Sequence, residues 1–236
     1  MSTHPTPIRL PFAGRPVLTT RDYDEAEQLL NHNLDESRRV NPLRAGAVAD
    51  IQITLEALPD IKLFGACWGD AVSVRSSPLA CWHGILPLAG AVSCIKGGQI
   101  AAAGEMLLFA PEHEVDVIWH DNTRAVVVAL KTSLLRDHLE QEYQQPLPNL
   151  RDRVMTIHRE DAALVSLGHL LRLTDAELAQ GSPLLALPTA RKHIQSLFCE
   201  SLLQMVPALQ SLPDRRVLPG MVKRAVDLFM PTSTAL

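Results

Sequence analysis

Basic residues are scarce for a protein that would bind nucleic acid directly. The 236-residue sequence holds 22 Lys and Arg against 26 Asp and Glu, which gives a formal net charge of −4. Nucleic-acid-binding domains usually present a basic face to the phosphate backbone. The charge balance therefore argues against a free-standing DNA- or RNA-binding protein.

Cysteine pairs and long apolar runs are also missing. The four cysteines form no CxxC pair, so neither a zinc knuckle nor a redox dithiol is predicted, and reduced thiols are typical of the cytosol. The N-terminus lacks the charged segment and apolar run of a secretory signal. The most apolar window, residues 86–110, is interrupted by Lys96, Gly97, Gly98 and Glu105, which excludes a membrane span. We expect a cytoplasmic protein without a membrane partner.

The usual motifs of catalysis are absent as well. The sequence has no GxSxG signature, and the Ser93-Cys94 pair lies in a predicted strand without a neighbouring base. Gly97-Gly98 is not followed by a helix start, so it cannot form a phosphate-cradling loop. We predict no catalytic residue and no cofactor.

What the sequence does contain is a series of short strands. Residues 50–57 alternate between polar and apolar side chains, as in a strand with one buried face. Further candidates are separated by Gly, Asp, Asn and Pro residues suited to tight turns. They cover 61–67, 71–76, 82–88, 91–95, 99–103, 105–110, 115–120 and 124–131. Because no helix separates them, a parallel sheet is excluded, and we predict an antiparallel barrel or sandwich.

Helices are predicted on both sides of the strands. Thr20 is expected to cap a helix whose apolar side chains share one face. Three more helices are predicted: one from Thr132 or Ser133, one over 160–179 and one over 188–208. The last carries a narrow apolar seam that suits a partner helix, formed by Ile194, Leu197, Phe198, Ser201, Leu202 and Met205. The seam is equally compatible with packing inside the chain's own domain.

The order of these elements resembles that of AraC/XylS-type transcriptional regulators. The segments that carry the resemblance are GACWGDAVSVRSSP, PEHEVDVIWHDNTRAVVVALKTSLLRDHLEQ and LPGMVKRAVDLFM. The resemblance implies an α+β fold, in which a cupin-like antiparallel β-barrel or sandwich is followed by an α-helical dimerisation segment. It divides the chain into an effector-binding domain with an N-terminal arm (1–145), a helical dimerisation segment (146–212), and a linker with the start of a DNA-binding domain (213–236).

The resemblance also implies what the protein would bind. We expect a homodimer that senses a small-molecule effector and contacts DNA only through a C-terminal helix-turn-helix half that this sequence does not contain, as in a truncated regulator. The N-terminal arm, Thr6 to Phe12, would fold over the bound effector as a lid with Ile8, Leu10 and Phe12 as its apolar contacts.

The expected effector site is an enclosed apolar pocket inside the barrel with a few polar anchors. Indole rings would stack on an aromatic or sugar-like effector, an arginine could pair with a carboxylate, and a histidine could hydrogen-bond. The predicted ligand-binding residues are Trp68, Arg75, Trp82, His83, Met106 and Trp119. The plainer alternative is core packing for the rings and solvation for the arginine.

A cupin-type metalloenzyme is the second hypothesis, because many cupin enzymes hold a metal with histidines and a carboxylate. The candidate ligands are Cys81, His83, His113, Glu114 and His120. The enzyme pattern requires an HxH pair, whereas CWHG at 81–84 offers one good ligand at most. We therefore predict no metal site.

Overall fold

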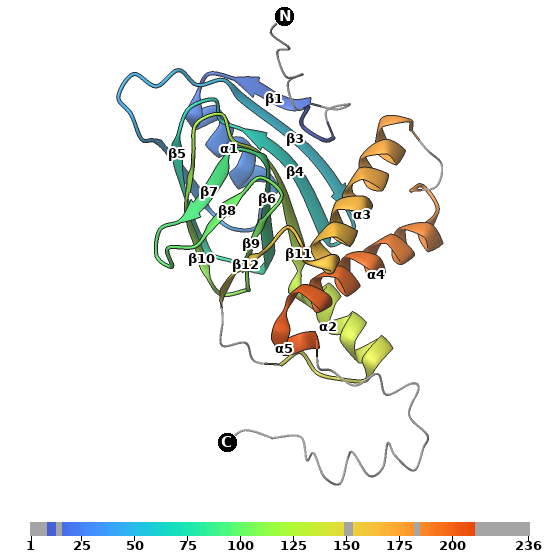
Figure 1. The fold of residues 1–236 in the computed structure, drawn as a ribbon. Coiled ribbons are helices and arrows are strands. Elements are labelled where there is room, and N and C mark those ends of the chain that lie inside the picture. Colours follow the sequence, from blue (N-terminus) through green and yellow to red (C-terminus); the bar gives the residue numbers. More distant parts are fainter. Residues whose placement is uncertain (1–8, 13–15, 149–152, 182–184, 211–236) are drawn as a thin grey trace, which may run out of the picture.

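The computed structural model describes residues 9–12, 16–148, 153–181 and 185–210 of the chain. Its strands form two sheets that face each other, and the C-terminal helices lie on an outer face of this sandwich (Figure 1). This arrangement confirms the predicted α+β class with an antiparallel, cupin-like sandwich. Within the described ranges, no helix is both long and apolar enough to cross a membrane.

The larger sheet has seven strands in the order β1-β3-β4-β11-β6-β9-β12, and every neighbouring pair is antiparallel. Its strands are β1 (Pro16–Thr20), β3 (Ile51–Leu58), β4 (Ile61–Cys67), β6 (Cys81–Ala89), β9 (Met106–Phe109), β11 (Arg124–Lys131) and β12 (Val154–Ile157). The two central strands, β6 and β11, pair along almost their whole length, so they form a rigid floor for whatever packs on the sheet.

The smaller sheet has five strands in the order β2-β5-β10-β7-β8, again all antiparallel. They are β2 (Arg38–Pro42), β5 (Val72–Pro78), β7 (Ala91–Cys94), β8 (Ile100–Ala102) and β10 (Glu114–Trp119). One face of this sheet packs against the larger sheet, and the apolar side chains between them form the first core.

The larger sheet separates two cores, as β6 illustrates. Successive side chains of a strand point to opposite faces. Ile85 therefore belongs to the core between the sheets, whereas Trp82 and Leu86 belong to a second core beneath the helices. Both faces of β6 are buried, because the strand has packed layers on either side.

Helix α1 (Tyr23–Asn33) closes one side of the sandwich beside β2. The prediction that Thr20 caps this helix is wrong. Asp22 is the N-cap and accepts a hydrogen bond from the Asp24 backbone N–H at 2.8 Å. Thr20 is the last residue of β1, so it lies before the helix start. Its hydroxyl donates to Glu25 Oε2 at 2.6 Å.

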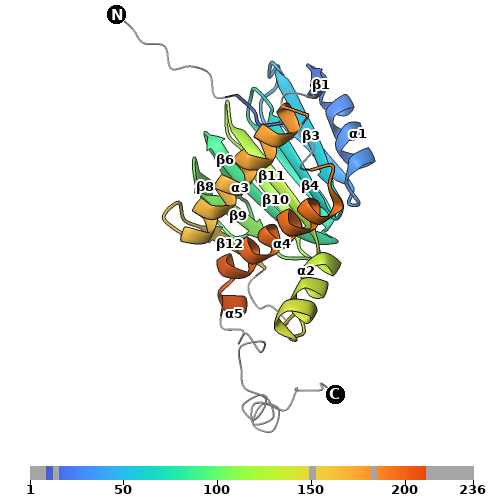
Figure 2. The ribbon, with the colours of Figure 1, turned by 90° about the vertical axis from the view of Figure 1, so that its right-hand side faces the viewer.

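The remaining helices follow β11 and β12. They are α2 (Thr132–His138) with the π-helical turn η1 (Leu139–Tyr143), α3 (Ala162–Ala179), α4 (Pro188–Met205) and the short α5 (Pro207–Gln210). Helix α3 crosses the outer face of the larger sheet, with α4 packed against it (Figure 2). Leu167 and Leu171 of α3 meet Phe198 and Leu202 of α4 in the second core.

Three strands were not predicted from the sequence: β1, β2 and β12. Strand β2 reads Arg-Arg-Val-Asn-Pro, a polar segment in which the buried positions are occupied by Arg38 and Val40, so it lacks an apolar alternation. Strand β12 pairs with β9 although it lies in the segment expected to be helical. The predicted linker and start of a DNA-binding domain, residues 213–236, lie outside the described residues.

Candidate functional site

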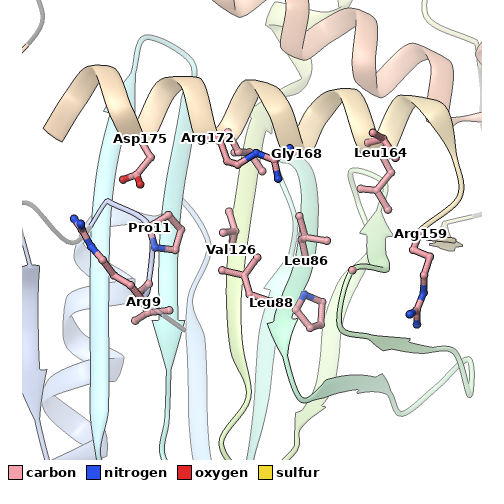
Figure 3. Close-up of a pocket in the computed structure, with 15 residues that line it drawn as sticks. Arg9, Pro11, Leu86, Leu88, Val126, Arg159, Leu164, Gly168, Arg172 and Asp175 are labelled. Carbon is pink, nitrogen blue, oxygen red and sulfur yellow. The ribbon is translucent and has the colours of Figure 1, made fainter. Parts of the chain in front are cut away.

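A cavity of about 530 Å³ lies between the larger sheet and helix α3. Its floor consists of apolar side chains from the central strands, with Leu86 and Leu88 of β6 beside Val126 of β11 (Figure 3). Its roof is α3, which contributes Leu164 and Leu171. This volume lies within the range of about 300–1,000 Å³ that is typical of small-molecule sites.

The space under α3 exists because the helix has a glycine in its sheet-facing stripe. Gly168 lies four residues after Leu164 and three before Leu171, so all three share one face of the helix. A Cβ atom built on Gly168 would meet no atom within 4 Å. A side chain is thus missing where the helix would otherwise fill the gap above the sheet.

The N-terminal arm closes one end of the cavity. Leu10 and Phe12 are buried, while Pro11 and Arg9 line the cavity. Phe12 has a positive φ of 61°, and its backbone N–H donates to the carboxylate of Asp175 on α3. The part of the arm before Arg9, including the predicted lid residues Thr6 and Ile8, lies outside the described residues.

Thr54 of β3 anchors the same arm from the sheet. Its hydroxyl donates to the carbonyl oxygen of Pro11 at 2.7 Å and accepts from the backbone N–H of Gly65 at 3.0 Å. Thr54 is buried, so these two bonds are shielded from water. The arm is thus held between the larger sheet and the C-terminal half of α3.

The polar side chains that line the cavity are mostly basic. They are Arg9 from the arm, Arg159 before α3, and Arg172 and Asp175 on α3. Arg159 is 56% exposed and its nearest carboxylate is that of its neighbour Glu160, at 4.0 Å. Arg172 extends beside Gly168 above the apolar floor, and Arg9 lies near Asp175 (Figure 3). The arrangement suits a ligand with an apolar body and a negative group.

Three of the predicted ligand-binding residues lie inside the sandwich. Trp68, His83 and Trp119 line a cavity of only about 40 Å³ between the two sheets. The two indole rings pack edge to face, with their centroids 6.2 Å apart and an interplanar angle of 83°. The rings fill the interior with each other instead of leaving an open stacking surface.

The other three predicted residues lie elsewhere, so the six do not form one pocket. Trp82 and Met106 face the helices, because Trp82 precedes His83 on β6 and the two must point to opposite faces. Arg75 points outward on β5, where its side chain is 63% exposed and forms an ion pair with Asp116 at 3.0 Å. None of the six lines the cavity under α3.

A buried polar group that the sequence did not reveal lies next to the small interior cavity. Arg38 of β2 is 3% exposed at its side chain and reaches Glu36 at 3.4 Å. Burial, and then the positive charge of Arg38, hold the pKa of His83 well below its ordinary value of 6.5, so the ring is neutral. Burial also raises the pKa of the Cys81 thiol to about 12, with the Glu36 carboxylate acting in the same direction.

Most of the predicted dimerisation seam is used within the chain. Ile194, Phe198, Ser201, Leu202 and Met205 are buried in the described monomer, where α4 packs against α3 and the larger sheet. Leu197 differs, because 52% of its surface is exposed. The structure therefore fits the alternative of intrachain packing for five of the six residues.

The candidate metal ligands are not brought together. Within the residues that the structure describes, no three His, Cys, Asp or Glu side chains are arranged to hold a metal ion. His83 is buried between the sheets, His120 contacts Ser93 at 2.7 Å, and Glu114 forms an ion pair with Lys96 at 2.8 Å. His113 stacks on Phe109, with ring centroids 6.2 Å apart.

The chain is similar in sequence to a protein family and in structure to several solved proteins. The model of the AraC-binding-like domain family matches residues 26–204. The AraC-like transcriptional activator CuxR has a similar structure, with a TM-score of 0.54, 15% identity, and coverage of 94% of this chain and 81% of that chain. No curated protein matches the chain in sequence.

More distant structural similarity extends to ToxT of Vibrio cholerae strain SCE256. The apo form of a ToxT point variant shares 9% identity with a TM-score of 0.45, covering 76% of this chain and 69% of that chain. The wild-type form bound to an unsaturated fatty acid shares 11% identity with a TM-score of 0.44, covering 73% and 62%.

Proposed function

Because the chain belongs to the AraC-binding-like domain family, we propose that it is the effector-sensing part of an AraC/XylS-type transcriptional regulator, with its effector bound between the larger sheet and α3. The observation that carries this placement is the size of the cavity there, about 530 Å³ with an apolar floor and a basic rim. Within the described part of the chain, no side chain cluster offers a metal centre as an alternative.

The interior of the sandwich supports the predicted barrel site less well. Its cavity of about 40 Å³ has room for about three water molecules, since each needs about 10–15 Å³. An effector of ordinary size would have to separate the packed rings of Trp68 and Trp119. The expectation of an aromatic effector rested on these rings, so it carries less weight for the cavity under α3.

An effector in the proposed site would act on the helices directly. Helix α3 is the roof of the cavity and shares the second core with α4 through Leu167, Leu171, Phe198 and Leu202. Ligand binding can shift a conformational equilibrium only through contacts that differ between the two states. We propose that the contacts between α3 and α4 differ between the ligand-free and ligand-bound states. The change in these contacts would then be transmitted to a DNA-binding half.

Dimerisation stays part of the proposal, with Leu197 as its remaining apolar contact. Leu197→Asp is expected to lower the dimer fraction in sedimentation velocity without loss of the folded state, because its side chain is exposed. Leu202→Asp serves as the contrast and should unfold the protein, because it places a charge in the second core. A monomeric wild-type protein at micromolar concentration would contradict dimerisation through this helix.

A thermal-shift screen with one variant in each candidate cavity tests where the effector binds. Anionic, neutral and cationic small molecules are added to wild type, Gly168→Leu and Trp119→Phe. A ligand at 100 times its Kd should stabilise the wild type by about 2.7 kcal/mol. We expect Gly168→Leu to remove the shift and Trp119→Phe to keep it. The reverse pattern would move the effector into the sandwich interior.

A further inference from the structure

We propose that the effector is an amphipathic anion, whose apolar part lies on β6 and β11 and whose anionic group is bound by Arg172. This inference rests on the proposed function, because it assigns ligand chemistry to the same cavity. The anionic character of the ligand is inferred from the side chains that line the cavity and from their ion-pair partners. It does not depend on the size of the cavity.

The basic character of the cavity is local. The chain as a whole carries a net charge of −4, yet the cavity is lined by three arginines and one acidic residue, Asp175. Asp175 already accepts the backbone N–H of Phe12, so it serves as the anchor of the arm. The rim is therefore positively charged in a protein with an excess of acidic residues.

Arg172 and Arg9 form no ion pair with any residue in the described ranges. Six other arginines have a carboxylate within 4.0 Å: Arg38, Arg39, Arg44, Arg75, Arg153 and Arg159. A guanidinium presents a planar fork of donors that matches a carboxylate or phosphate in a bidentate way. The fork of Arg172 is available for such a group.

The position of Arg172 directs this fork to the cavity. It follows Gly168 by one helical turn, and the absence of a side chain at Gly168 leaves open space beside it. Figure 3 shows the Arg172 side chain extending below α3 toward the region above Val126 and Leu86. An anionic group held there would place the attached apolar chain directly over these residues.

The inner surface disfavours a sugar-like or other polyhydroxylated ligand. The floor and roof present alkyl side chains: Leu86, Leu88 and Val126 below, Leu164 and Leu171 above. A hydroxyl group buried against them without a hydrogen-bond partner would cost about 1–3 kcal/mol. The polar groups lie at the rim, so the ligand needs a polar head and an apolar body.

Octanoate, octan-1-ol and octylamine form a matched set of probes that differ only in the head group. Their Kd values are measured by isothermal titration calorimetry below micellar concentrations. The variants are Arg172→Met, which keeps a long unbranched side chain without the charge, Gly168→Leu, which places a side chain in the cavity, and Arg136→Met on α2 as a control outside the cavity.

We expect octanoate to bind the wild type at least tenfold more tightly than octan-1-ol, with octylamine weakest. Arg172→Met should raise the Kd of octanoate by about tenfold to a hundredfold, the usual effect of losing a hydrogen bond to a charged group. Arg136→Met should leave it unchanged, and Gly168→Leu should abolish binding.

Three different results would overturn the inference, and they can be told apart. If octan-1-ol binds as tightly as octanoate, Arg172→Met has no effect, and Gly168→Leu still abolishes binding, the cavity is the site but the ligand is not an anion. If octanoate binds equally well to Gly168→Leu, the proposed site itself is wrong. Failure of octanoate to bind the wild type would overturn the assignment of an amphipathic anion and leave the site to the wider screen.

Discussion

Replacing Gly168 with alanine should make the protein more stable, although the residue lies in a buried-facing stripe. Glycine inside a helix costs about 0.8–1.0 kcal/mol relative to alanine. A Cβ atom at this position meets nothing within 4 Å, so the substitution introduces no clash to offset that gain. For a chain of this size, 1 kcal/mol corresponds to about 2–4 °C in Tm. We therefore expect Gly168→Ala to raise Tm by about 2–4 °C in the absence of ligand.

Gly65→Ala is the matched control, because the same substitution meets a filled site. There the new Cβ would lie 2.4 Å from Thr54 Oγ1, and the Thr54 side chain would have to give up its bonds to Gly65 and Pro11. Losing those buried hydrogen bonds should cost about 1–3 kcal/mol. Thermal and urea unfolding, followed by circular dichroism, measure both variants against wild type.

A lower Tm for Gly168→Ala would contradict this expectation. It would mean that in solution α3 lies close enough to the sheet for a methyl group at position 168 to clash, and the cavity of about 530 Å³ would then be closed. Gly168→Leu extends the test, since it should raise stability without ligand while removing the ligand-induced shift. Gly168→Leu would then raise the stability of the free protein while it lowers its affinity for the ligand.

Three further predictions concern the arm, a histidine and two thiols. Thr54→Val removes the hydrogen bond to Pro11, one of the two that hold the arm, so trypsin should cleave after Arg9 faster than in wild type; equal rates would contradict this anchoring. Because the pKa of His83 lies well below 6.5 in the native state, the unfolded chain binds an extra proton as pH falls through 6.5. Stability should then fall by up to about 1.4 kcal/mol per pH unit, and His83→Gln should remove that slope; an unchanged slope would exclude His83 as its source. Burial raises the pKa of Cys81 and Cys199 to about 12, so Ellman's reagent should modify both only after denaturation, and rapid native modification would show that they are accessible.

The fold was predictable because it depends on patterns that are local in sequence. Alternation identified most strands from β3 to β11, and the lack of intervening helices excluded a parallel sheet. Strand β2 could not be found in this way, since its buried positions include Arg38. This arginine pairs with Glu36, whose buried carboxylate is held by tertiary contacts with Ala80 and Cys81. Polarity alone cannot show that an arginine is inside the protein.

The candidate site was harder to predict, because its position depends on strand alternation and on a glycine in helix α3. Adjacent residues of a strand face opposite sides, so Trp82 and His83 could never share a pocket. A glycine in the apolar stripe of a predicted helix, as at Gly168 between Leu164 and Leu171, was a visible sign of a gap under that helix. Whether the gap becomes a cavity depends on the sheet and the arm, which come from distant parts of the chain.

Hydrogen–deuterium exchange with and without the most stabilising ligand from the screen locates the effector site directly. We expect slower exchange along α3, in the arm residues 9–12 and in β6 around Leu86, because these segments surround the cavity. Protection confined to β5 and β10, which carry the interior residues Val74 and Trp119, would contradict it and place the effector between the two sheets.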